Sequence, residues 1–174
     1  MTDTPALTRF YGKYRGTVVN NIDPMQIGRI MAIVPDVSGA IPTSWAMPCL
    51  PSAGINTGFF TVPQIGAGVW VEFEHGDPDH PIWVGGYWGT AAEVPVLAHT
   101  VPPAVNGVTI QTTLKNGIVI SDVPGPTGGI MIQTTTGAMI SVSDVGILIS
   151  NGKGAVISMI GPAVDINAGA LTVV

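Results

Sequence analysis

Acidic and histidine side chains gather in one short stretch of the chain. Two glutamates, two aspartates and two histidines lie between Glu72 and His80, at the start of the segment EFEHGDPDHPIWVGGYWG. At this density, imidazoles and carboxylates could bind a metal ion or transfer protons as a general acid and base. A metal site needs His75, Asp77 and His80 to converge, so the stretch would have to fold back on itself. The other interpretations are a turn between two strands and an acidic contact surface for a partner.

The dipeptides inside this stretch favour the turn. Asp77-Pro78 and His80-Pro81 combine an aspartate, which bonds back to the local backbone, with prolines that fix φ. Glu72 and Glu74 are two residues apart and therefore share one face of a strand. We interpret the stretch as a hairpin turn. We expect no catalytic, cofactor-binding or metal-binding residues in this chain, and no cofactor.

A glycine-rich segment near the C-terminus, SNGKGA around Lys153, invites comparison with a phosphate-binding loop. That motif has about four residues between its first glycine and its Gly-Lys pair. Gly146 and Gly152 have five residues between them. Gly154 also occupies the position where the motif has Ser or Thr. The match fails, and a turn between short strands accounts for the segment.

The single cysteine is the remaining candidate nucleophile. Cys49 stands in no recognisable nucleophile motif, and His99 lies in a different part of the chain, so nothing in the sequence pairs the two. We expect Cys49 to be a buried structural residue. No catalytic pair is visible, so we predict that the protein is not an enzyme, and a lytic enzyme is the function with the least support.

A cluster of cations interleaved with tyrosines is the nearest feature to a nucleic-acid surface: Arg9, Tyr11, Lys13, Tyr14, Arg15 and Arg29. Rings and cations together can stack on and neutralise a single strand. The net charge of −5 opposes this function, because such binding depends on neutralising phosphates. We favour a basic face towards another protein or a neighbouring protomer, and expect no nucleic-acid partner.

The chain carries little charge for a water-exposed protein. Only 10% of its 174 residues are charged, although a monomer's surface needs charge to stay soluble. Prolines interrupt the charge-free stretch 37–71, and no apolar run approaches the roughly 18–20 residues of a spanning helix. The segment MTDTPALTRF lacks the pattern of a signal peptide, and a single cysteine fits a reducing cytoplasm. We expect synthesis in the cytoplasm and an oligomer that covers the apolar surface.

The two halves of the chain differ in composition. Every aromatic residue lies at or before Trp88, so the second half cannot build a core around large rings. The first half shows five short strand patterns separated by turns and no helical periodicity, which fits a small closed β-barrel of the OB type. The predicted strands span residues 10–19, 26–34, 44–50, 68–74 and 82–87.

The second half consists of short β-branched runs punctuated by Gly, Asn and Pro, which is typical of a β-solenoid. The runs begin at Ile118, Ile130, Met139, Ile147, Val156, Val164 and Leu171. Each turn has too few residues to close a prism within one chain, and unpaired strand edges would invite association. Three chains winding together would pair every edge and bury the Ile and Val faces.

The first half also resembles a known family. The ordered segments FYGKYRGTVVNNIDP, QIGRIMAIVPDV, WAMPCLPSAG and GFFTVPQIGAGVWVEFEHGDPDHPIWVGGYWG resemble the OB domain of phage baseplate assembly protein V and of VgrG-type spikes. The resemblance covers about residues 9–89. It implies an all-β protein in which a five-stranded OB barrel precedes an intertwined triple-stranded β-helix, assembled as a homotrimer.

The resemblance implies a three-part organisation. We expect an OB barrel at 1–89, a Pro/Ala-rich linker at 90–107 and a triple-stranded β-helix spike at 108–174. The linker has no room for the lysozyme domain that some phage relatives carry. About eight residues precede the barrel, which leaves no room for the hub region of VgrG proteins. A separate hub protein is therefore an expected partner, and a PAAR-type tip protein could cap the C-terminal end.

The function implied by the resemblance is mechanical. The chain would form the central spike of a contractile tail or contractile injection system, assembled into a phage tail or a tail-like particle. Sheath contraction would drive the trimer into the target envelope, so the target membrane would be touched only transiently. The alternative is a trimeric OB-fold binding module for single-stranded nucleic acid or glycan.

Overall fold

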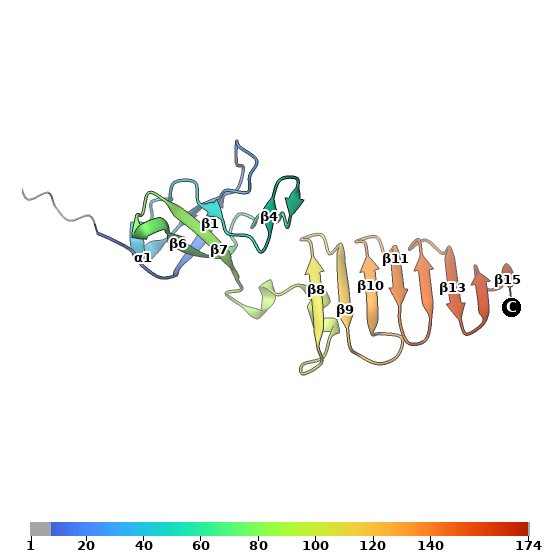
Figure 1. Cartoon of the computed structure of the whole chain (residues 1–174). Helices are drawn as coiled ribbons and strands as arrows, with labels where there is room; N and C mark the ends of the chain where they lie inside the picture. The colour runs from blue at the N-terminus through green and yellow to red at the C-terminus, as the bar shows by residue number, and fades with distance from the viewer. Residues whose placement is uncertain (1–7, 174) are drawn as a thin grey trace, which may run out of the picture. The chain divides into compact units, whose positions relative to one another are not determined.

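A computed structural model of the chain describes residues 8–173. The chain divides after Ala91 into two compact units, and both are built from β-strands (Figure 1). Within the described residues, no helix is long and apolar enough to cross a membrane. The strands that build both units confirm the all-β class predicted from the sequence.

The first unit is a curled five-stranded sheet with the order β2-β1-β6-β7-β3. Its neighbours pair antiparallel, except for the parallel pair β3 and β7. Isolated bridges join Ile30 to Ala46 and Ile33 to Pro42, which brings the two outer strands of the sheet together as in a barrel. The strands are β1 (Tyr14–Asn20), β2 (Met31–Ile33), β3 (Met47–Pro48), β6 (Gly68–Phe73) and β7 (Pro81–Tyr87).

Period-2 alternation builds the core of this unit. On β6, Val69, Val71 and Phe73 point inward and are at most 7% exposed. The intervening residues of the strand are half-buried on the opposite face. Trp83 of β7 fills the centre, and its indole Nε1 donates a hydrogen bond to the Gly28 carbonyl oxygen at 3.0 Å. The alternation predicted for this strand is confirmed.

Several elements of the first unit differ from the sequence prediction. The strand expected at 26–34 is reduced to β2, because the side chain of Asp23 accepts hydrogen bonds from the backbone N–H groups of Ile27 and Arg29 and holds this segment as a loop. A short helix, α1 (Pro35–Ser38), and a small hairpin, β4 (Ala53–Gly54) with β5 (Thr57–Gly58), were not expected. Elements of two to four residues are too short to leave a periodic pattern.

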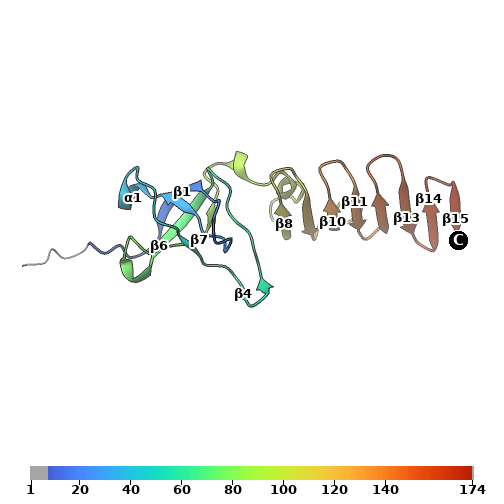
Figure 2. The same cartoon turned by 90° about the horizontal axis from the view of Figure 1, so that it is seen from above.

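The second unit is one eight-stranded antiparallel sheet in which each strand pairs with the next along the chain (Figures 1 and 2). Seven of its strands coincide with the predicted runs, and β8 is additional. The strands are β8 (Gly107–Gln111), β9 (Gly117–Ser121), β10 (Gly129–Gln133), β11 (Met139–Val142), β12 (Ile147–Ser150), β13 (Val156–Ile160), β14 (Ala163–Ile166) and β15 (Leu171–Val173).

The pairing of these strands corrects one expectation. We expected three chains to pair their strand edges with one another, but each strand from β8 to β15 pairs with the neighbouring strand of the same chain. Tight connections between consecutive strands explain the difference, because a short turn favours an antiparallel hairpin with its own neighbour. The β8–β9 turn, for example, reverses through Lys115 at a φ of 67°. In the described sheet the outer edges of the terminal strands β8 and β15 have no partner strand, and its two faces are the larger surface available to other chains.

Two 3-10 helices precede this sheet, η2 (Ala91–Glu93) and η3 (Val96–Thr100). Helix η3 packs on β8 and β9, where Leu97 is buried. The Leu97 backbone N–H donates to Oε1 of Gln111 at 2.9 Å. Residues 96–100 of the expected linker therefore belong to the second unit.

Candidate assembly surface

The acidic stretch 72–80 comprises the end of β6 and the connection from β6 to β7. It contains a one-turn 3-10 helix, η1 (Glu74–Gly76), and its backbone closes on itself. Glu74 N–H donates to the His80 carbonyl at 2.9 Å, and His80 N–H donates to the Asp77 carbonyl at 3.0 Å. Asp79 N–H donates to Oδ1 of Asp77 at 3.1 Å, as expected of an Asx turn. The hairpin interpretation is confirmed.

The side chains of this turn engage different partners. Asp77 Oδ2 lies 3.3 Å from Nη1 of Arg9, and Glu72 pairs with Lys13. His80 Nδ1 is 3.9 Å from Oδ1 of Asp77, beyond hydrogen-bond distance. Across residues 8–173, no three His, Cys, Asp or Glu side chains lie close enough to hold a metal ion together. That the chain uses no metal, cofactor or catalytic residue stays a prediction.

The expectation for Cys49 is wrong, because this side chain is exposed. Ala46 lies in the core, and alternation along the segment directs Met47 and Cys49 to the outer side. Lys153 lies in the turn between β12 and β13, where Asn151 Oδ1 accepts hydrogen bonds from the N–H groups of Lys153 and Ala155. The turn predicted at SNGKGA is confirmed.

The cations of the first unit do not form one free basic surface. Three of them pair with acids of the same unit, namely Arg9 with Asp77, Lys13 with Glu72 and Arg29 with Asp23. The Arg15 guanidinium lies 5.4 Å from the ring centres of both Trp70 and Tyr87. Most of this positive charge is therefore neutralised within the unit.

The pKa of Asp23 is shifted by the groups around its carboxylate. Its carboxylate is 4% exposed and accepts a 2.6 Å hydrogen bond from Nη2 of Arg29. The Arg29 side chain, together with backbone N–H groups of Met25, Ile27 and Arg29, holds the pKa of Asp23 well below its usual range. The network fixes the loop between β1 and β2.

The sheet of the second unit has one face formed by Ile, Val and Leu side chains and one Met side chain. Residues paired directly across an antiparallel ladder point to the same side, so the register defines two rows that we call the aliphatic face. One row contains Ile110, Ile118, Ile132, Ile140, Ile149, Ile157, Ile166 and Leu171, and the other contains Val108, Ile120, Ile130, Val142, Ile147, Met159 and Val164.

Much of the aliphatic face is open to solvent in the single chain. Ile110, near one end, is 61% exposed, and Ile149, in the interior of the sheet, is still 38% exposed. Removing apolar surface from water contributes roughly 25 cal/mol per Å². A monomer rarely leaves a contiguous apolar patch of this extent uncovered. The aliphatic face therefore has the size and composition of an interaction surface.

The opposite face has a mixed composition. Its central row contains both apolar and polar residues: Thr109, Val119, Met131, Ser141, Leu148, Ser158 and Asp165. Helix η3 already covers its β8–β9 end, and there Val119 is 4% and Ser121 is 7% exposed. Helix η3 thus covers part of the mixed face and leaves the aliphatic face open.

Two family models match the chain, one on each unit. The type VI secretion system/phage-baseplate injector OB domain matches residues 14–88. The phage baseplate V C-terminal trimerisation domain matches residues 107–172, which contain the whole aliphatic face. The chain belongs to the phage baseplate V family. No curated protein matches it.

The OB match of this baseplate V chain covers all five strands of the curled sheet, and the trimerisation match begins with β8. The resemblance read from the sequence is confirmed. The second unit of the chain matches a trimerisation domain. The uncovered aliphatic face therefore lies in the domain that joins chains in this family.

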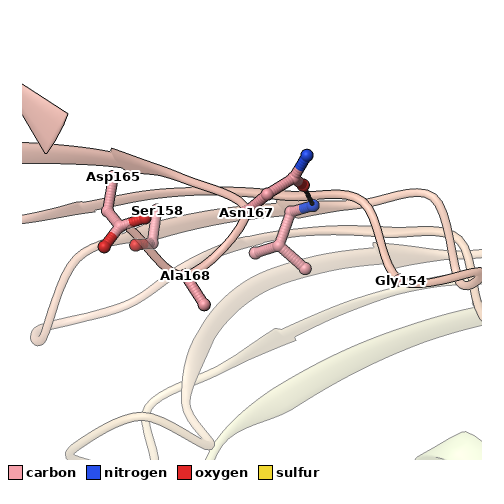
Figure 3. A pocket seen from close by; sticks show the side chains of 6 residues that line it. Gly154, Ser158, Asp165, Asn167 and Ala168 are labelled. Carbon is pink, nitrogen blue, oxygen red and sulfur yellow. Dashed lines mark hydrogen bonds between the residues drawn. The ribbon is translucent and has the colours of Figure 1, made fainter. Parts of the chain in front are cut away.

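A shallow groove on the mixed face of the baseplate V chain offers no comparable surface (Figure 3). It is lined by residues around the β14–β15 turn, including Ser158, Asp165 and Asn167. Asn167 Oδ1 accepts the Val156 N–H at 2.9 Å, and Asp165 Oδ1 accepts the Gly169 N–H at 2.7 Å. These polar atoms already hold the local backbone together.

Sequence reasoning missed one buried residue of the second unit, Leu97, through which η3 packs on the sheet. It lies in a segment rich in proline and alanine, and a single leucine there gives no periodic signal. The Ile-x-Ile pattern of the successive runs, by contrast, is a visible signal for the aliphatic face, because alternate residues of a strand share a face.

Proposed function

We propose that this protein is the central spike of a contractile tail or contractile injection system, built as a homotrimer. The observation that carries the proposal is the continuous aliphatic face inside a domain of the trimerisation family. Three sheets that each turn this face inward would enclose a dry triangular prism. Burial of Ile and Val from three chains would then stabilise the assembly.

The geometry of the sheet suits a mechanical role. Strands lie about 4.8 Å apart, so eight strands extend on the order of 35 Å along the stacking direction. Each strand is hydrogen-bonded to its neighbours, and the aliphatic side chains of the three protomers would interdigitate between the sheets. Bending such a shaft would break many of these interactions together. Sheath contraction could therefore drive it into a target envelope without deforming it.

The remaining assignments follow from the family as parts of the same proposal. Residues 1–89 would form the barrel, 90–107 the connection and 108–174 the shaft. A separate hub protein would hold the barrel end, and a tip protein could cap the shaft. Its role would be structural rather than enzymatic, with the target membrane contacted only during penetration and no nucleic acid bound.

Light scattering on the purified protein tests the trimer. We expect three times the 17.9 kDa mass of one chain at micromolar concentration. Ile140→Asp would place three carboxylates inside the apolar prism and should abolish the trimer, because an unpaired buried charge costs several kcal/mol.

Ser141→Asp is the matched control for this substitution. Ser141 is the next residue on β11 and lies on the mixed face, so its variant should remain trimeric. A wild-type monomer would contradict the proposed function. Equal assembly of the Ile140→Asp and wild-type proteins would contradict the inward orientation of the aliphatic face.

A further inference from the structure

The charged side chains of the second sheet are separated by sign. Lys115 and Lys153 lie in the β8–β9 and β12–β13 turns, whereas Asp122 and Asp144 lie in the β9–β10 and β11–β12 connections. Successive connections of a meander lie at alternate ends of its strands, so they form two rows of turns along the two long edges of the sheet (Figure 1). Both lysines therefore occupy one edge, which we call the lysine edge, and both aspartates occupy the opposite aspartate edge. Asp165, the fifth charged residue from Gly107 onward, lies on the mixed face.

These four charges are available to another chain. All four residues are exposed, and within the described part of the chain none of them forms an ion pair. Asp144 Oδ2 accepts the Gly125 N–H at 3.1 Å, which leaves its charge in place and holds it on the edge. The Asn151 side chain likewise fixes the backbone at Lys153.

Symmetry determines which edges meet in the proposed trimer. When three parallel chains turn one face inward around a threefold axis, every contact is heterologous, so the lysine edge of one protomer meets the aspartate edge of the next. A chain inserted upside down would bring like edges together. The separation of charges along the sheet is therefore complementary only when all three chains point the same way.

We propose that the lysine and aspartate edges form an electrostatic seam between protomers that selects the parallel trimer. The inference rests on the proposed function. The aliphatic face repeats Ile or Val at nearly every position, so apolar contact alone discriminates weakly between orientations and registers. Charges at an interface contribute mainly to such specificity. The parallel arrangement matters because a spike needs its three C-terminal ends at one tip.

Charge reversal of each edge provides the first test. Lys115→Glu with Lys153→Glu makes both edges acidic, and Asp122→Lys with Asp144→Lys makes both edges basic. Each double variant should weaken the trimer about tenfold or more, since it replaces six pairs of opposite charge with contacts between like charges. High salt should reduce the difference from wild type, because it screens exposed charges.

The variant that combines all four substitutions separates the seam from net charge. It restores opposite charges at every junction with the signs exchanged, so its assembly should return close to wild type. The variant that replaces both aspartates, Asp122→Lys with Asp144→Lys, brings the net charge of the chain closer to zero. It would assemble better than wild type if net charge alone mattered. Failure of the fourfold variant to recover, or stronger assembly of this double variant, would overturn the seam.

Zero-length carbodiimide cross-linking of the wild-type protein tests the contact directly. The two edges of one sheet are separated by a strand of about five residues, roughly 16 Å, so a direct Lys–Asp link must join different chains. We expect mass spectrometry to find Lys115 or Lys153 joined to Asp122 or Asp144. A cross-linked trimer without any such link would contradict the seam but not the proposed spike function. A wild-type monomer would contradict the spike function itself.

Discussion

The side chain of Leu97 occupies space that Gly117 leaves open by having no side chain. A Cβ atom at Gly117 would lie 2.6 Å from Cδ1 of Leu97, closer than real Cβ contacts allow. Leu97 belongs to η3, and Gly117 is the first residue of β9. This contact fixes the entry of the chain into the trimerisation sheet.

Removal of the Leu97 side chain should destabilise the second unit. Leu97→Ala leaves a cavity between η3 and the sheet, and we expect a loss of about 2 kcal/mol, at the low end for buried leucines. Val96→Ala is the control, because Val96 is 55% exposed and should change stability by less than about 0.5 kcal/mol. Urea unfolding at one fixed protein concentration measures both, and equal effects would contradict the role of Leu97.

Asp23 should make the first unit sensitive to acid. The Arg29 side chain and three backbone N–H groups hold its pKa below the usual value, so its contribution to stability is complete above the unfolded-state pKa near 4. That contribution is lost as the pH falls through the lower folded-state pKa. Asp23→Asn should lower the melting temperature at neutral pH and flatten its fall below about pH 4. A variant whose melting curve tracks wild type from pH 7 to pH 2 would refute this role.

Gly152 should tolerate no side chain. A Cβ there would lie 2.6 Å from the Gly137 carbonyl carbon, and the residue has a φ of 68°. We expect Gly152→Ala to cost on the order of 1–3 kcal/mol. Gly154→Ala in the same turn is the comparison, because no atom lies within 4 Å of its Cβ position at a φ of 104°. Calorimetry should rank Gly152→Ala as the more destabilising of the two.

The histidines of the β6–β7 turn should be dispensable. His75→Ala combined with His80→Ala removes no hydrogen bond that closes the turn, since the backbone makes those bonds. We expect an unchanged trimer mass and a stability change within about 0.5 kcal/mol. Metal analysis gives a second readout: stoichiometric zinc or iron in wild type that disappears in the double variant would contradict the structural interpretation.

The first unit should fold without the second. Residues 1–91 contain the whole curled sheet and its buried Trp83, so this fragment should melt cooperatively with native-like tryptophan fluorescence. Its self-association should be far weaker than that of the whole chain, because the aliphatic face is absent. A tight trimer of the fragment would place the main trimer contacts in the barrel.

Sequence alone determined the features that depend on local pattern. Alternation at Val69, Val71 and Phe73 identified a core strand, because period 2 is a property of the extended backbone. The Asp77-Pro78 turn was readable because its bonds form within a few residues. Seven strand positions of the second unit followed from β-branched runs between turn residues, and the ordered motifs of the first half identified the family.

The tertiary structure decided what depends on contacts between distant residues. The hydrogen bonds of Asp23 shortened β2, and the burial of Ala46 in the core turned Cys49 outward. No local sequence signal tells which residue of that segment faces the core. Pairing of each strand with its own neighbour placed the aliphatic rows on one face and separated Lys115 and Lys153 from Asp122 and Asp144. The spacing of runs in a sequence is the same whether strands pair within a chain or between chains. Only the register of the folded sheet decides which side chains share a face and which share an edge.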